Sequence, residues 1–201
     1  MKRLILFIIS ILCLQINAGA ARRFHVGAEW GTNFTLLNFH HFNYMDEAVG
    51  FRIDDQGWEA GKGQNAYVSL CTGLDLGGKT NLSVLGGVCG LPVGRRAVTV
   101  SLKGTYLPGG TASDGVLFFI EGGGAAVWHP ETASAVFART GGGYRLMLDS
   151  HASIDVHLCL RNTYDHPRVW DEVEERYIQK RNIRRNNAWY CALELGVALT
   201  F

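Results

Sequence analysis

The chain has 201 residues, nearly equal numbers of basic and acidic side chains (19 against 18, a net charge of +1) and 25 glycines. This charge balance excludes the basic surface that nucleic-acid binding requires, so we expect no nucleic-acid partner. The length fits a single domain behind a short leader.

The first 20 residues have the pattern of a secretory signal peptide. A basic start at Lys2-Arg3 precedes an apolar run over residues 4–14, and Ala18-Gly19-Ala20 supplies the small residues of a cleavage site. The run is about 11 residues long, which is shorter than the roughly 20 residues of a membrane-spanning helix. We predict a signal peptide over residues 1–20 and one β-barrel domain over residues 21–201.

The next segment, residues 24–37, alternates apolar side chains with polar or small ones. A period of two indicates a β-strand, and here it predicts that Glu29 and Asn33 face inward. From residue 38 to residue 63 the alternation stops, and we predict a long loop rich in acidic and aromatic residues. His40 and His41 lie in it near Asp46. Adjacent side chains of an extended chain point to opposite sides, so we predict no metal site.

Six further segments alternate in the same way. They cover residues 65–76, 81–90, 97–107, 116–128, 134–147 and 152–164. Gly-Gly-Lys-Thr at residues 77–80 predicts a tight turn after the first of them. The facing of segments 81–90 and 116–128 stays open. With residues 129–132 as a hairpin centre, the glycine runs 122–124 and 141–143 come to lie opposite each other, which predicts a wall patch without side chains.

A second long loop is predicted over residues 165–187, where a charged run fits either a short helix or a protruding hairpin. The last segment, residues 189–201, places apolar side chains at every second position and ends on Phe201. A soluble domain seldom ends directly after a fully apolar face, whereas a strand of a transmembrane barrel touches lipid on one face. We predict a closing strand.

These segments predict an all-β fold, an eight-stranded antiparallel up-and-down transmembrane β-barrel. Both long loops fall at one end and short turns at the other, as in bacterial outer membrane barrels. Side chains fill the interior of a barrel of this size, so we expect no aqueous channel. Charges at that depth need partners, which predicts a salt-bridged interior. Its members are expected to be Glu29, Asp75, Lys103, Arg145, Asp155, His157, Arg161 and Glu194.

Four cysteines remain after the predicted leader, namely Cys71, Cys89, Cys159 and Cys191. Each lies inside a predicted strand, and Cys159 and Cys191 fall on opposite faces of theirs. This placement favours small apolar fillers over a disulfide framework or a metal site.

The signal peptide, the eight alternating segments, the long loops at one end and the terminal aromatic resemble the small OmpX/OmpA-type outer membrane β-barrel proteins. The resemblance implies a monomer in the Gram-negative cell outer membrane, surrounded by outer membrane lipid. It also implies insertion by the barrel assembly machinery, with Phe201 as the assembly signal. It does not imply one activity, because that family includes adhesins, structural anchors and enzymes.

The leading functional hypothesis is a non-enzymatic barrel with no cofactor, whose outer loops carry any binding to an extracellular partner. Candidate binding residues in the loops are the aromatic side chains of Phe42, Tyr44, Trp58, Trp170 and Tyr177.

Two alternatives remain open. In a lipid A modifying, deacylase-like enzyme, His151 would act as base for a Ser153 nucleophile. A soluble lipocalin-like carrier would instead have an apolar interior and a polar exterior.

Overall fold

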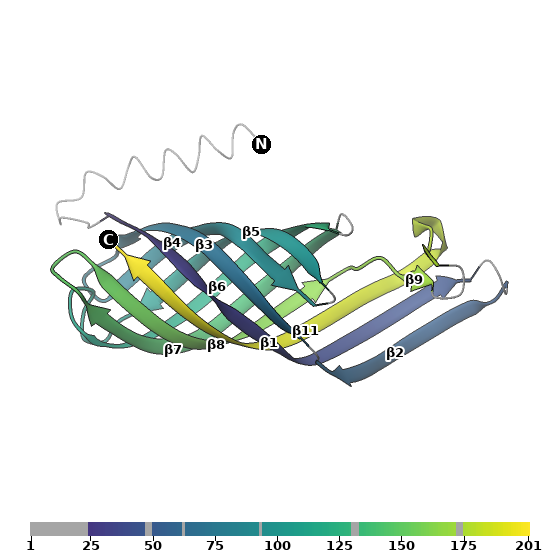
Figure 1. The fold of residues 1–201 in the computed structure, drawn as a ribbon, viewed down its shortest axis with the longest axis horizontal. Coiled ribbons are helices and arrows are strands. Elements are labelled where there is room, and N and C mark those ends of the chain that lie inside the picture. The colour runs from purple at the N-terminus through teal and green to yellow at the C-terminus, as the bar shows by residue number, and fades with distance from the viewer. Residues whose placement is uncertain (1–23, 47–49, 62, 93, 130–132, 172–174) are drawn as a thin grey trace, which may run out of the picture.

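The computed structural model describes residues 24–46, 50–61, 63–92, 94–129, 133–171 and 175–201. The signal peptide lies outside these residues and stays a prediction. Apart from one short 3-10 helix, all regular structure in the described part of the chain is β-strand. Figure 1 shows the strands wound into one elongated barrel.

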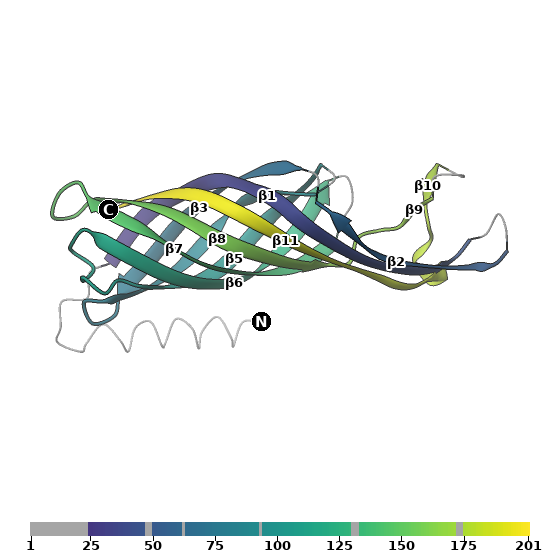
Figure 2. The same cartoon turned by 90° about the horizontal axis from the view of Figure 1, so that it is seen from below.

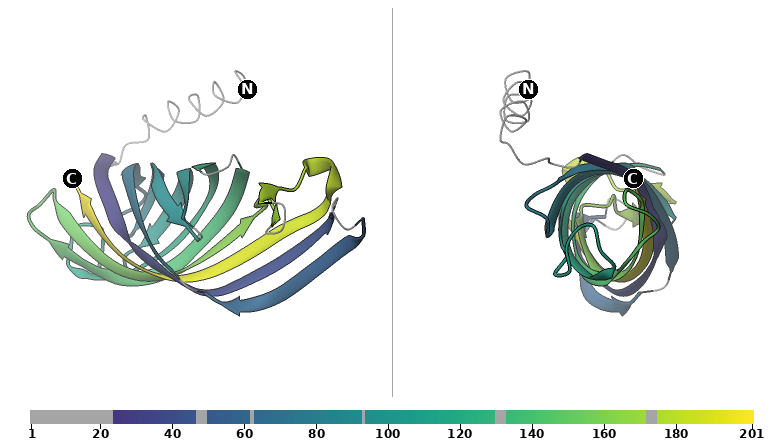
Figure 3. Two further views of the ribbon diagram at one scale, coloured as in Figure 1. Left: turned by 45° about the vertical axis from the view of Figure 1, so that its right-hand side comes forward. Right: turned by 90° about the vertical axis from the view of Figure 1, so that its left-hand side faces the viewer.

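Eight long strands close into that barrel. Each pairs antiparallel with the next one along the chain, and the last strand pairs with the first (Figure 3, right). The prediction of an eight-stranded antiparallel up-and-down barrel is confirmed. The strands are β1 (Phe24–Met45), β3 (Gln64–Asp75), β4 (Thr80–Leu91), β5 (Arg95–Tyr106), β6 (Gly115–His129), β7 (Ala133–Met147), β8 (Ser153–Asp165) and β11 (Ile183–Thr200).

Burial alternates along the strands as the period of two requires. On β5, Thr99, Ser101 and Lys103 are buried inside the barrel, whereas Val100 and Leu102 between them are exposed on its outer surface. The polar side chains therefore point inward and the apolar ones outward.

The two ends of the barrel differ. At the end that carries both described termini, which we call the terminal end, Phe201 exchanges two backbone hydrogen bonds with Val26 (3.0 and 2.8 Å). The β3–β4, β5–β6 and β7–β8 connections lie at this same end. The opposite end, which we call the hairpin end, carries the two connections that were predicted to be long loops (Figure 1).

The loop predicted over residues 38–63 is wrong for most of its length. β1 continues to Met45, β2 (Arg52–Ala60) folds back along it, and β11 begins at Ile183 on its other side. The three strands form a curved extension beyond the barrel, which we call the blade (Figure 2). The apolar alternation stops because both faces of the blade mix polar and aromatic residues. The backbone ladder continues because β11 supplies a partner far away in sequence.

The second loop contains a very small hairpin, β9 (Trp170–Asp171) with β10 (Arg176–Tyr177), followed by the 3-10 helix η2 (Lys180–Asn182). The structure therefore contains both open alternatives in short form, a hairpin and a 3-10 helix. The loop ends earlier than predicted because β11 starts at Ile183 to build the blade.

The predicted pairing of the two glycine runs is wrong. Gly123 lies opposite Phe137, and Gly141 lies opposite Phe119. A Cβ at Gly123 would sit 2.9 Å from the Phe137 ring, so Gly123 makes room for that ring on the inner face. A Cβ at Gly122, on the outer face, would meet nothing within 4 Å.

Candidate functional site

The middle of the barrel holds a network of buried ion pairs centred on Arg139. Its guanidinium donates 2.6 and 2.7 Å hydrogen bonds to Glu121 and Glu29 and also pairs with Glu194. Lys103 reaches the other oxygen of Glu29 at 2.6 Å. These five side chains come from β1, β5, β6, β7 and β11, so the network joins strands from around the whole barrel.

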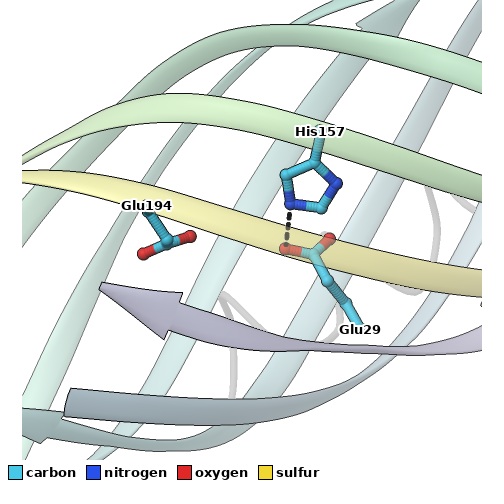
Figure 4. A group of neighbouring side chains, drawn as sticks. All are labelled: Glu29, His157 and Glu194. Atoms are coloured by element: carbon cyan, nitrogen blue, oxygen red, sulfur yellow. Dashed lines mark ion pairs between the residues drawn. The ribbon is translucent and has the colours of Figure 1, made fainter. Parts of the chain in front are cut away.

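His157 and Arg161 complete the network. His157 Nε2 lies 3.4 Å from Glu29 Oε1, and Arg161 lies 3.6 Å from Glu194. Figure 4 shows Glu29, His157 and Glu194 pointing toward one another from three strands. Gly196 leaves this space open, because a Cβ there would collide with His157 and with the Tyr67 hydroxyl.

The charges of this network balance. Glu29, His157 and Glu194 together could offer ligands to a metal ion, but arginine and lysine already neutralise the carboxylates. A buried charge is tolerable when it is paired and hydrogen-bonded, and this network meets that condition. Three carboxylates face three permanent cations: Glu29, Glu121 and Glu194 against Lys103, Arg139 and Arg161.

Toward the hairpin end the interior becomes apolar. A buried cluster fills it there, and Arg95 with Asp165 lies beyond, paired at 2.5 Å with side chains almost fully buried. Arg95 also donates a 3.1 Å hydrogen bond to Tyr190. The cluster consists of Tyr67, Cys89, Leu91, Ala97, Ala125, Val127, Ala135 and Phe137.

Toward the terminal end the interior is partly open, with polar groups on one side and a small apolar cluster that includes Leu107 and Leu117 on the other. Arg145 forms two 2.7 Å hydrogen bonds with Asp155, and His25 lies 3.6 Å from Asp75. A cavity of about 250 Å³ opens beside these groups. We call this region the mouth.

The structure places all eight residues of the expected interior network on inward-facing strand positions, in two groups. Asp75, Arg145 and Asp155 lie at the mouth, and the other five lie in the central network.

The central residues Arg139 and Glu121 were missed in the sequence. Arg139 lies six residues before Arg145 on β7, so both side chains face the interior, and strict alternation would have predicted an inward Arg139. Glu121 lies on the strand whose facing stayed open.

The four cysteines are thiols in the structure. Cys159 is buried inside the barrel, whereas Cys191 lies at one of the β11 positions that alternate with the inward-facing ones. The two buried thiols border the central network, with Cys159 Sγ 3.6 Å from Glu194 and Cys89 Sγ 3.5 Å from Arg161.

On one face of the blade three aromatic rings meet. Phe39 and Trp58 have ring centroids 5.0 Å apart, and Trp58 meets Trp189 edge-on at 5.4 Å. Trp58 remains 61% exposed. The cluster ties β1, β2 and β11 together where they leave the barrel.

The two histidines of the blade point to opposite faces, as expected for neighbours on an extended chain. His40 pairs with Asp55 at 3.2 Å, and His41 pairs with Asp54 at 2.9 Å. Each therefore has a different carboxylate partner, which holds β2 to β1.

The other loop candidates lie in two places. Phe42 and Tyr44 belong to the blade, where the Phe42 ring stacks on His40 at 5.3 Å. Trp170 and Tyr177 meet edge-on at 4.9 Å in the β9–β10 hairpin. The structure thus separates the five aromatic candidates into a blade group and a hairpin group.

The suggested pair of His151 and Ser153 does not form a nucleophile–base pair. The His151 ring lies 2.6 Å from the hydroxyl of Ser150 in the exposed β7–β8 turn, whereas Ser153 is buried at the start of β8. The turn bends His151 away from the strand alternation on which the pairing relied.

Comparison with known proteins gives distant likenesses. No family profile matches the chain, and no curated protein sequence matches it. Among solved structures it is similar to the outer membrane protein OprG from Pseudomonas aeruginosa, at 9% identity over 90% of this chain and 96% of that one, with a TM-score of 0.47. It is also similar to the outer membrane protease OmpT from Escherichia coli, at 8% identity over 88% and 97% of the two chains, with a TM-score of 0.39. These likenesses are too distant to carry an activity over.

Proposed function

We propose that this chain is an integral outer membrane β-barrel protein whose closed barrel anchors the blade at the cell surface for binding an extracellular partner. The barrel assembly machinery would insert it, reading the terminal strand with Phe201. The closed barrel itself serves as the anchor, and the blade is the part available to the partner.

The observation that carries this proposal is the distribution of polarity across the barrel wall. Leu70, Val100 and Ile120 are 71%, 61% and 64% exposed on the outside, and comparable apolar residues surround the barrel on every strand. A soluble monomer rarely exposes an apolar surface of such extent. In lipid the same surface is buried, as on the outer face of known membrane barrels.

The boundary of this apolar belt is marked at the hairpin end. Arg96 is exposed there at the start of β5, and Trp128 is exposed at the end of β6. Tryptophan and a charged residue are typical of the lipid–water interface. In the part of the chain that the structure describes, no helix is long and apolar enough to cross a membrane.

The lipocalin-like alternative is contradicted by the interior. A carrier needs an apolar cavity, but Glu29, Arg139 and Glu194 fill the middle of this barrel and are each at most 3% exposed. The same residues, together with the apolar cluster beyond them, support a closed barrel without a channel. Planar-bilayer recordings of the purified protein are expected to show no stable conductance, and a steady open channel would contradict the closed interior.

The blade offers opposite charges on its two sides. β2 exposes Asp54, Asp55 and Glu59, whereas η2 and the start of β11 expose Lys180, Arg181, Arg184 and Arg185. Exposed Trp58 and Phe51 lie on the acidic side, on and next to β2. On such a surface the charge pattern would set specificity for a partner, and contacts with the aromatic side chains would add affinity.

The proposed orientation can be tested with trypsin on intact cells. We expect cleavage after Lys180 or Arg181 in η2, which leads into the blade, and protection of Lys79, which is exposed in the β3–β4 turn at the terminal end. A variant with Lys180→Gln and Arg181→Gln is the matched control and should lose that cleavage. Cleavage at Lys79 with an intact blade would invert the orientation and overturn surface presentation.

A further inference from the structure

We propose that the mouth contains a hydrolytic site in which Ser83 is the nucleophile, His25 the general base and Asp75 the residue that orients the base, acting on small carboxylic esters. This activity goes beyond the anchoring role of the barrel. It is independent of the blade, which lies at the opposite end.

The three side chains have the order that acyl transfer requires. His25 Nε2 lies 2.9 Å from Ser83 Oγ, and His25 Nδ1 lies 3.6 Å from Asp75 Oδ1. The Nδ1–carboxylate separation is just beyond hydrogen-bond distance; an Nδ1 proton directed at Asp75 on substrate binding would leave Nε2 free to accept the serine proton. With its amide nitrogen turned toward the carboxylate, Asn81 donates a 2.8 Å hydrogen bond to Asp75 and fixes its position.

Strand register brings these residues together from three strands. His25 of β1 lies opposite Gly73 of β3, and Gly73 lies opposite Ser83 of β4, so the three form one row across the barrel wall. A Cβ at Gly73 would sit 2.6 Å from His25 Nε2 and 2.7 Å from Ser83 Oγ. The missing side chain is therefore what lets the imidazole reach across β3 to the serine. Asp75 follows two residues later on the same face.

The space next to the serine suits a small substrate. Ser83 and His25 line an inner pocket of about 30 Å³, enough for one water molecule or a carbonyl group. His25, Asn81 and Arg145 line both this pocket and the 250 Å³ cavity of the mouth. A short acyl or alcohol group fits the larger space, which opens toward the terminal end of the barrel.

The reaction balances with water as the second substrate. Ser83 Oγ bonds to the ester carbonyl carbon while its proton moves to His25 Nε2, and that proton then passes to the departing alcohol as the ester bond breaks. A water molecule gives a proton to His25 and attacks the acyl-serine, and the carboxylic acid leaves as Ser83 regains its proton. Thr105 also lines the inner pocket, and we assign its hydroxyl as a donor to the developing oxyanion.

In the alternative, purely structural role, His25 fills the space above Gly73 and serves only as the hydrogen-bond partner of the Ser83 hydroxyl. The two possibilities differ in chemistry, because a filler residue does not activate a serine toward electrophiles. Reactivity of Ser83 with a fluorophosphonate is therefore the distinguishing property.

The test uses the purified, folded full-length protein in detergent with a fluorophosphonate probe and 4-nitrophenyl butyrate as ester. Wild type should be labelled, and Ser83→Ala should lose labelling and at least about 100-fold of the hydrolysis rate. Ser69→Ala is the matched control, since Ser69 is also inward and buried but outside the lining of both mouth pockets. It should behave as wild type.

Two further readouts keep the test decisive. Mass spectrometry of labelled wild-type protein should place the probe on Ser83, which requires no variant to fold. Asp75→Asn should lower kcat much more than it changes KM, as expected of a residue that acts through the base. An unlabelled wild type without ester hydrolysis, or a probe on another serine, would overturn the assignment.

Discussion

At the scale of single residues, Arg139 organises the interior. One guanidinium contacts Glu29, Glu121 and Glu194, and the rings of Tyr67 and Phe119 lie 5.0 and 5.6 Å from it. A planar cation with five donors suits this task, since it can serve several carboxylates at once. The network depends on it because removal leaves buried negative charge without a partner.

Replacing Arg139 with methionine should therefore destabilise the folded barrel by about 3–5 kcal/mol. Urea unfolding followed by tryptophan fluorescence measures the change. Arg96→Met is the matched control on the exposed side of β5, where a shift within about 0.5 kcal/mol is expected. Equal effects of the two substitutions would show that the network does not stabilise the fold.

A second residue-scale prediction concerns the β7–β8 turn. Hydrogen bonds from the backbone N–H groups of His151 and then Ala152 hold the pKa of Asp149 below its ordinary value of 3.8. Because the folded-state pKa is lowered, the turn contact is fully present above pH 3.8 and is lost as the pH falls below that value. NMR titration of the His151 and Ala152 amide resonances should give a midpoint below 3.8. A midpoint at or above 3.8 would contradict the contact.

At the scale of elements, glycines set how closely the strands approach and what fills the gaps. Gly141 of β7 lies against the backbone of β8, where an added Cβ would collide with the Leu158 carbonyl and the Cys159 side chain. Gly122 of β6 has open space around it and faces outward. Both glycines belong to a run of three, so the sequence does not distinguish them. The difference is in the atoms that surround each one.

These two glycines give a matched pair of substitutions. Gly141→Ala should cost about 1–3 kcal/mol through overpacking between β7 and β8, whereas Gly122→Ala should be close to neutral. The midpoint of urea unfolding separates the two outcomes. A neutral Gly141→Ala would mean that β7 and β8 are not packed as closely as described.

Local alternation predicted the barrel strands well because each strand separates outward apolar side chains from interior polar ones within its own sequence. It failed for the blade, where β1 continues between two partners, β2 next to it in sequence and β11 near the other end of the chain. It also missed the row of His25, Gly73 and Ser83, since that row exists only in the register between strands. The His151 and Ser153 pair was suggested instead because it was close in sequence.

At the scale of the whole molecule, the barrel wall separates two environments. Its outer surface is apolar all round, while its interior pairs charges in the centre and at both ends. This arrangement is stable when hydrocarbon surrounds the barrel, because each barrel strand is then buried on its apolar side and hydrogen-bonded to a neighbour on both edges.

A charge placed on the apolar belt should therefore be costly. Val100 lies in the middle of β5 and faces outward, and Val100→Lys is expected to destabilise the inserted barrel by about 2–4 kcal/mol. Leu76, at the terminal edge of the belt, provides the control, since Leu76→Lys should cost at most about 1 kcal/mol near the interface. Unfolding titrations in lipid vesicles measure both. Equal tolerance at the two positions would argue against a lipid-facing belt.

The most direct test of the account is gel mobility of the outer membrane fraction, loaded unboiled and boiled in detergent. A closed barrel surrounded by lipid should be found in that fraction, run faster when unboiled and shift to the mobility of the unfolded mature chain after boiling. A soluble protein with the same mobility before and after boiling would contradict both the closed barrel and its place in the membrane.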